Sequence, residues 1–202
     1  MYPIYNFDSQ APGGLPVGWY APGLFAVNSE QSHSAPNSAK ISSQYGGTNQ
    51  SWINNRFTFW IRPTGTNSGS SYCWFGVPNG GSTLSPSMNG RIRFAGNNHI
   101  TYSSGANLIG IDTGLLYNAD QFYKVEVECN FATHRYSVWL DTVLIINDVP
   151  FYNCLLGPYL SNESFSLIYG NNSVYIDDFI ITETAVPLML KDVRIFDSRV
   201  IQ

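Results

Sequence analysis

The stretch FYKVEVECNFATHRYSVWLD (residues 122–141) alternates between apolar and polar side chains in two runs, with a short turn between them. Side chains of a β-strand point alternately to its two faces, so this period of two predicts two half-buried strands. The positions predicted to be buried are Tyr123, Val125, Val127, Cys129, Tyr136, Val138 and Leu140. The positions predicted to be exposed are Lys124, Glu126 and Glu128. A slip of one residue would reverse every assignment, so the burial of these side chains tests the prediction.

Strand-like segments recur along the rest of the chain between turns rich in Gly, Pro, Ser and Asn. In RFTFWI (56–61), Phe57 and Phe59 face inward and Trp60 faces outward by the same alternation. Further candidate strands are SYCWFGV (71–77), GRIRFAG (90–96) and SFSLIYG (164–170). No segment has the periodicity of a helix of three turns. Many short strands at even spacing favour a β-sandwich or jelly roll, and we expect one all-β domain over residues 1–185.

Composition and charge exclude some classes of partner. The chain has 202 residues, a net charge of −4 and 12% charged residues, without the basic stripe that neutralises phosphates in nucleic-acid-binding proteins. No apolar run approaches the roughly 18 residues of a membrane span. The segment MYPIYNFDSQ (1–10) lacks the basic and apolar regions of a signal peptide. Cys73, Cys129 and Cys154 are an odd set without metal-ligand spacing.

The segment SVYIDDFIIT (173–182) reads as a core strand but carries two adjacent carboxylates. Strict alternation puts Asp178 in one row with Ile176, and Asp177 in the other row with Phe179. Each charge then lies among apolar side chains, which is costly unless a cation, a hydrogen-bond network or water satisfies it.

Several of these segments resemble a known group of domains. The paired runs at 122–141, with NFDSQAPGGLPVGW (6–19), SAPNSAKI (34–41) and VYIDDFIIT (174–182), are similar to strands of concanavalin A-like and laminin G-like jelly rolls, in particular non-catalytic carbohydrate-binding modules. The resemblance covers roughly residues 5 to 184. It implies a two-sheet antiparallel jelly-roll sandwich whose first and last strands are paired, followed by a C-terminal extension.

The same resemblance implies a structural Ca²⁺. In such modules acidic residues from the first and last strands help to hold the ion, which places Asp8, Asp177 and Asp178 as candidate ligands here. Carboxylate oxygens are the hard ligands that this ion prefers. The alternative needs no metal: one aspartate is solvated at a sheet edge, and the other accepts hydrogen bonds from loop amides.

Catalysis is less well supported by the residues. Glu126 and Glu128 lie on one strand face, about 6–7 Å apart by strand rise, but the acidic strand motif of laminarinase-like glucanases is absent. His33, His99 and His134 lie in separate polar segments without a nucleophile or metal motif. We interpret the glutamate face as solvated and salt-bridged, with Lys124 and Arg135 as its partners, and predict no catalytic residues.

Binding is the better candidate. Trp60 and Trp139 fall on the outward phase of their strands, as does either Trp74 or Phe75. Flat aromatic side chains on a sheet suit stacking against a sugar ring. The alternative is that these rings lie under a second sheet, a loop or a subunit interface.

Residues 186–202 continue past the closing strand. This tail is either an extra edge strand of the same domain or an arm that docks on a neighbouring subunit by strand addition. Its apolar residues are Leu188, Leu190, Val193, Ile195 and Phe196.

These observations favour a non-catalytic interaction protein that presents a surface to glycans or to other protein subunits, with no nucleic-acid or membrane partner. The first interpretation is an accessory or decoration component of a particle such as a phage virion, which would assemble as a homo-oligomer or with other subunits. The alternative is a secreted carbohydrate-binding module. Both settings place the protein outside the cell or on a virion surface. A polysaccharide-degrading glycosidase or lyase is the least supported function.

Overall fold

The structure is a computed structural model. It describes residues 4–5, 7–15, 17, 25–41, 45–47, 55–65, 71–78, 88–105, 107–130, 133–151, 164–170 and 174–183. These residues form strands and turns, without a helix. Among them, therefore, no helix is long and apolar enough to cross a membrane.

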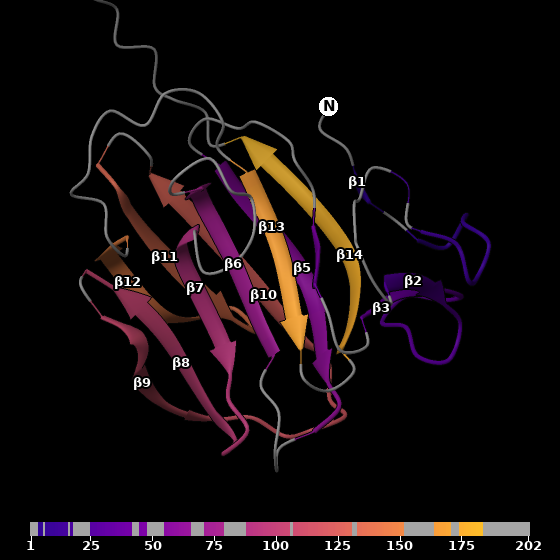
Figure 1. Cartoon of the computed structure of the whole chain (residues 1–202), viewed down its shortest axis with the longest axis horizontal. Coiled ribbons are helices and arrows are strands. Elements are labelled where there is room, and N and C mark those ends of the chain that lie inside the picture. The colour runs from indigo at the N-terminus through magenta and orange to yellow at the C-terminus, as the bar shows by residue number, and fades with distance from the viewer. Residues whose placement is uncertain are drawn as a thin grey trace, which may run out of the picture.

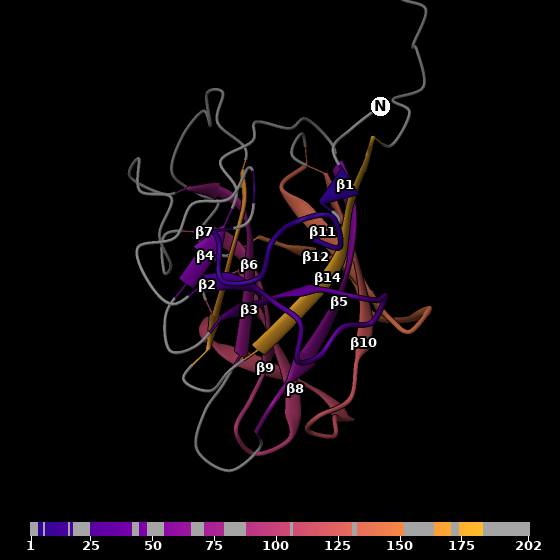
Figure 2. The ribbon, with the colours of Figure 1, turned by 90° about the vertical axis from the view of Figure 1, so that its right-hand side faces the viewer.

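Two antiparallel sheets stack face to face (Figures 1 and 2). Sheet A is eight-stranded, with the order β12-β11-β10-β5-β14-β3-β2, and β1 pairs with β14. Its strands are β1 (Ile4–Tyr5), β2 (Phe25–Asn28), β3 (Ser38–Ile41), β5 (Asn55–Pro63), β10 (Tyr123–Asn130), β11 (Arg135–Leu140), β12 (Val143–Pro150) and β14 (Val174–Glu183).

Sheet B is six-stranded, with the order β4-β13-β6-β7-β8-β9. Its strands are β4 (Tyr45–Gly47), β6 (Ser71–Pro78), β7 (Met88–Phe94), β8 (His99–Ser104), β9 (Asn107–Leu116) and β13 (Ser164–Gly170). The prediction of an all-β, two-sheet antiparallel sandwich is confirmed. The pairing of the first strand with the last is confirmed too, with Ile4 opposite Ile180 and Tyr5 opposite Phe179.

The core lies between the sheets, and the alternation of the sequence identifies it correctly. The predicted core residues are at most 8% exposed, and they are Phe57, Phe59, Tyr123, Val125, Val127, Cys129, Tyr136, Val138 and Leu140. The register agrees, because Val127 of β10 lies between Phe57 of β5 and Val138 of β11. Burying these apolar side chains supplies the main favourable free energy of folding.

The prediction that Lys124, Glu126 and Glu128 are exposed is wrong in degree. All three lie on the outer face of sheet A but are half-buried. The side chain of Glu126 is only 13% exposed, because Arg56 of β5 and Lys124 both lie against its carboxylate. Long basic side chains cover neighbouring surface in this way even where a strand face points to solvent.

Some sequence predictions lie outside the described residues. The tail, residues 186–202, is among them, with Leu188, Leu190, Val193, Ile195 and Phe196. Cys154 also lies outside the described residues. The backbone of Cys73 and Trp74 is described as part of β6, but their side chains are not. The domain boundary at residue 185 therefore stays a prediction.

Candidate functional site

A β-bulge in β14 explains how two adjacent aspartates fit into a core strand. Asp177 lies opposite Trp60 and Ile180 lies opposite Thr58, so β14 contains one more residue than β5 between these two pairs. Asp178 takes a left-handed φ of 47° at this point. An extra residue shifts the alternation by one. Phe179 is consequently fully buried on the core side, and the prediction that Asp178 shares the apolar row of Ile176 is wrong.

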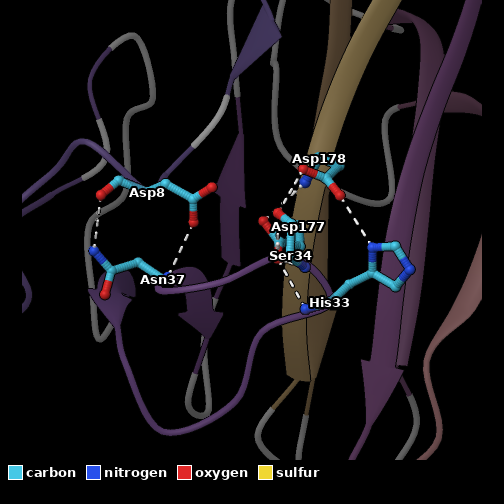
Figure 3. Close-up of polar contacts among 6 residues, drawn as sticks. All are labelled: Asp8, His33, Ser34, Asn37, Asp177 and Asp178. Atoms are coloured by element: carbon cyan, nitrogen blue, oxygen red, sulfur yellow. Dashed lines mark hydrogen bonds and ion pairs between the residues drawn. The ribbon is translucent and has the colours of Figure 1, made fainter.

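Asp177 is fully buried beneath the β2–β3 loop (residues 29–37) and accepts hydrogen bonds from backbone amides (Figure 3). Its Oδ2 accepts from the N–H of His33 at 2.9 Å and from the N–H of Ser34 at 3.0 Å. Its Oδ1 accepts from the N–H of Asp178 at 2.9 Å. This is the alternative that the sequence left open, in which an aspartate caps loop amides.

Asp178 holds the side chains of the same loop. Its Oδ1 accepts from the hydroxyl of Ser34 at 2.8 Å, and its Oδ2 lies 3.0 Å from Nδ1 of His33 (Figure 3). The two aspartates therefore bind one loop segment through its backbone and its side chains. This arrangement fixes the β2–β3 loop against the outer face of sheet A.

The electrostatics of the buried carboxylate follow from its surroundings. Burial raises the pKa of Asp177 to about 6, and the negative charge of Asp178 adds to this effect. The hydrogen bonds from the Ser34, Asp178 and His33 amides lower the pKa and offset part of the rise. Asp177 is consequently ionised at neutral pH but takes up a proton in mildly acidic solution.

Asp8 ties the N-terminal segment to the far end of the β2–β3 loop. Its Oδ1 accepts from the N–H of Asn37 at 3.1 Å (Figure 3). The side-chain amide of Asn37, which is buried, donates to the carbonyl of Gln10 at 2.9 Å and to the carbonyl of Asp8 at 3.4 Å. The first strand region and β14 therefore meet at one loop, but through different residues of it.

The hydrogen bonds of Asp177 and Asp178 do not form the calcium site that the sequence resemblance predicts. N–H and O–H donors point at the oxygens of Asp177 and Asp178, whereas a Ca²⁺ site needs those oxygens turned toward the ion. In the part of the chain that the structure describes, no three His, Cys, Asp or Glu side chains are grouped to hold a metal. The carboxylates are satisfied without a cation, and the calcium hypothesis stays a prediction.

Trp60 and Trp139 lie on the outer face of sheet A, as the alternation predicts, and both are half-buried. The imidazole of His33 stacks on Trp60, with ring centroids 3.5 Å apart and an interplanar angle of 11°. The β2–β3 loop thus covers one face of this indole. For Trp60 the alternative that a loop covers the ring describes the structure.

Trp139 has a different neighbourhood, here called the Trp139 patch and made of Arg56, Glu126, Trp139, Val143 and Leu144. The guanidinium carbon of Arg56 lies 5.1 Å from the ring centroid. Glu126 and Leu144 flank Trp139 on the neighbouring strands, and Val143 and Leu144 are exposed. The patch combines a flat aromatic ring with charged groups at its margin.

Glu126 sits at the centre of an ion-pair network. Its Oε1 lies 2.6 Å from Nζ of Lys124, and its Oε2 lies 2.6 Å from Nη2 of Arg56. Lys124, followed by Arg56, lowers the pKa of Glu126 despite its partial burial. The predicted salt-bridged face is therefore present with Arg56 in place of Arg135, which pairs with Asp148.

The sequence did not predict that the β2–β3 loop covers Trp60, or that Arg56 is the second basic partner of Glu126. The sequence places His33 in a polar segment, and nothing in its spacing indicates a partner 145 residues away in the chain. Arg56 precedes the alternating run RFTFWI and could have been placed on the outer face by extending that alternation. The backbone of Trp74 lies opposite Arg91 in sheet B.

No protein-family model matches this chain, and no curated protein matches it in sequence. Its fold is similar to that of solved structures. A structure titled "Sialidase" superposes with a TM-score of 0.65 at 13% identity, covering 91% of this chain and 18% of that chain. The cellulose-induced protein Cip1 superposes with a TM-score of 0.53 at 16% identity, covering 82% of this chain and 90% of that chain. A sialidase from Trypanosoma rangeli in complex with sialic acid superposes with a TM-score of 0.52 at 12% identity, covering 81% of this chain and 30% of that chain.

The chain thus spans less than a third of the length of these two sialidases and most of the length of Cip1. At such low identity the likeness concerns the fold alone. What this chain shares with these proteins is a two-sheet antiparallel β-sandwich.

Proposed function

We propose that this chain is a non-catalytic β-sandwich that binds carbohydrate through the Trp139 patch. The observation that carries the proposal is a half-buried indole on the outer face of a sheet, bordered by Arg56 and Glu126. Apolar faces of sugar rings stack on aromatic rings, while charged side chains bind the sugar hydroxyls. Proteins of similar fold carry names that refer to carbohydrates, which supports the same class of ligand.

The state of Glu126 supports binding rather than turnover. A glycosidase needs a carboxylic acid of raised pKa to protonate the leaving group. Lys124 and Arg56 instead hold the pKa of Glu126 below its usual value. An ionised, twice-paired carboxylate accepts hydrogen bonds from hydroxyls but does not donate a proton.

A glycan array followed by calorimetry tests this function. We expect Trp139→Ala to weaken binding of the best glycan at least about tenfold, a change of about 1.4 kcal/mol. Trp139→Phe keeps an aromatic face and should retain most of the affinity. Leu116→Ala, at an exposed apolar position at the end of β9 in sheet B, is the matched control and should bind as the wild type does. Unchanged binding in Trp139→Ala would refute the proposal, and so would hydrolysis of a glycan that Glu126→Gln abolishes.

A subunit of a larger particle, such as a virion decoration protein, is the second candidate. The exposed Val143 and Leu144 favour it, because they form an apolar ridge on the β11–β12 hairpin. Light scattering after size exclusion tests it, with full-length protein compared with a chain truncated after residue 185. Assembly lost on truncation, with an unchanged thermal melt, is the expected result for a docking arm. A monomer at all concentrations would contradict this setting.

A further inference from the structure

Trp60 and Trp139, on the outer face of sheet A, lie close enough for one glycan chain to reach both. Trp60 of β5 lies opposite Lys124 of β10, and Trp139 of β11 lies opposite Glu126 of the same strand. The two tryptophans are therefore two strands and two residues apart, which places their Cα atoms about 12 Å from each other. A glycan that extends from Trp139 across β10 would reach Trp60 next.

The ring of His33 occupies the place on Trp60 where a sugar ring would stack. The two ring centroids are 3.5 Å apart and the interplanar angle is 11°, so imidazole and indole are in face-to-face contact. This separation is direct van der Waals contact, so no further ring fits between them. The imidazole also makes an edge contact with Phe122, with ring centroids 5.9 Å apart. The covered face of Trp60 is therefore closed to a sugar in this structure.

Two aspartates hold His33 in this position. Nδ1 of the imidazole lies 3.0 Å from Oδ2 of Asp178 (Figure 3). The backbone N–H groups of His33 and Ser34 donate to Oδ2 of Asp177 at 2.9 Å and 3.0 Å. Because these backbone contacts do not involve the ring, a substitution of the His33 side chain leaves this anchor of the loop in place. The side chain of His33 is 35% exposed, so it lies at the surface over which a ligand would extend.

We propose that His33 determines how long a glycan this face accepts, because it keeps Trp60 from stacking on a second sugar. In the native protein the glycan stacks on Trp139 alone, and sugar units beyond the Trp139 patch add no stacking contact. The preferred ligand is consequently a short oligosaccharide rather than an extended stretch of polysaccharide. This inference rests on the proposed function, since Trp139 must bind a sugar for His33 to limit the ligand.

Calorimetric titration with cellobiose, cellotetraose and cellohexaose tests the proposal, because these glycans differ only in length. We expect the wild type to bind all three with affinities within about threefold of one another. His33→Asn keeps a hydrogen-bond donor near Asp178 but has no ring. This variant should bind cellohexaose at least about fivefold more tightly than the wild type does, with its affinity for cellobiose unchanged. His33→Phe retains a flat ring and should behave as the wild type does.

Two further variants show whether Trp60 causes the gain. Trp60→Ala in the His33→Asn background should return the affinity for cellohexaose to that of the wild type. His99→Ala removes a half-buried histidine of β8 in sheet B and is the matched control, with an unchanged dependence on glycan length. Thermal melts establish that each variant is folded, and His33→Ala takes the place of His33→Asn if that variant does not fold.

The outcomes separate this inference from the proposed function. Binding that depends on Trp139, with the same length dependence in the wild type and in His33→Asn, would overturn the role of His33 and leave the proposed function intact. A gain in His33→Asn that Trp60→Ala does not remove would also overturn it, since Trp60 would then not be the second stacking ring. Absence of binding of all three glycans, in the wild type and in the His33 variants alike, would overturn this inference and leave the glycan array to decide the proposed function.

Discussion

Trp60 and Trp139 lie on the same outer face of sheet A, two strands apart, with different surroundings. The β2–β3 loop brings the His33 ring into a stack on Trp60, and the loop itself is held by the buried Asp177. Trp139 has the Arg56 side chain at its ring and exposed apolar residues beside it. The comparison teaches that outward alternation alone does not decide whether an aromatic ring is covered, because a loop from elsewhere in the chain can stack on it, as His33 does on Trp60.

The largest expected effect concerns the residue that fixes the covering loop. Asp177→Ala removes the acceptor of three backbone N–H groups, and each unsatisfied buried donor costs about 1–3 kcal/mol. We expect a loss of about 3–5 kcal/mol in the free energy of unfolding, measured by urea denaturation at pH 7. Asp112→Ala, at an exposed ion pair, should cost no more than about 1 kcal/mol. Equal losses in the two variants would show that the loop is not anchored by Asp177.

The next effect is a pH dependence of the same anchor. Because the folded-state pKa of Asp177 is raised to about 6, the native state binds this proton more tightly than the unfolded state does. The stability that the group contributes is fully present below about pH 4 and is lost as the pH rises through about 6, by at most about 3 kcal/mol.

The difference in unfolding free energy between wild type and Asp177→Asn, followed from pH 4 to pH 7, measures this contribution. The wild type should lose stability relative to the variant as the pH rises, since the variant has no ionisable group at this position. A constant difference across the range would contradict the raised pKa.

His33→Ala and Arg56→Ala compare the two tryptophans directly. Removing His33 takes away a ring stack and the contact with Asp178, at a cost of about 1–2 kcal/mol. Removing Arg56 takes away a partly exposed cation–π contact and one of two ion pairs, at about 0.5–1 kcal/mol. Acrylamide quenching should rise more for His33→Ala. The reverse order of effects would mean that Trp60 is already accessible.

The sequence predicts correctly which side chains of β5, β10 and β11 face the core, but it does not predict the faces of β14 beyond Asp177. The reason is physical. Alternation is local, so Phe57, Val127 and Val138 can be assigned to the core from their neighbours alone. The bulge at Asp177 and Asp178 breaks the period of two, and strict alternation then assigns Phe179 to the wrong face. The partner of these aspartates is a loop far away in the chain, and no local pattern encodes its position.

The smallest expected effect concerns calcium. The sequence resemblance predicts that Ca²⁺ held by Asp8, Asp177 and Asp178 raises the melting temperature by several degrees over a melt in chelator, as binding to the folded state alone would do. The hydrogen bonds that satisfy Asp177 and Asp178 predict melts that coincide. Differential scanning calorimetry with calcium and with EDTA, repeated on Asp8→Asn, separates the two.

A fluorescence titration of Trp60→Phe and Trp139→Phe with the best-binding glycan tests the central claim most directly. The claim is that Trp139 is the accessible binding aromatic of sheet A, while Trp60 is covered by the β2–β3 loop. We predict that the change in tryptophan emission on glycan binding persists in Trp60→Phe and is lost in Trp139→Phe. Persistence of the change in Trp139→Phe together with its loss in Trp60→Phe would contradict the account.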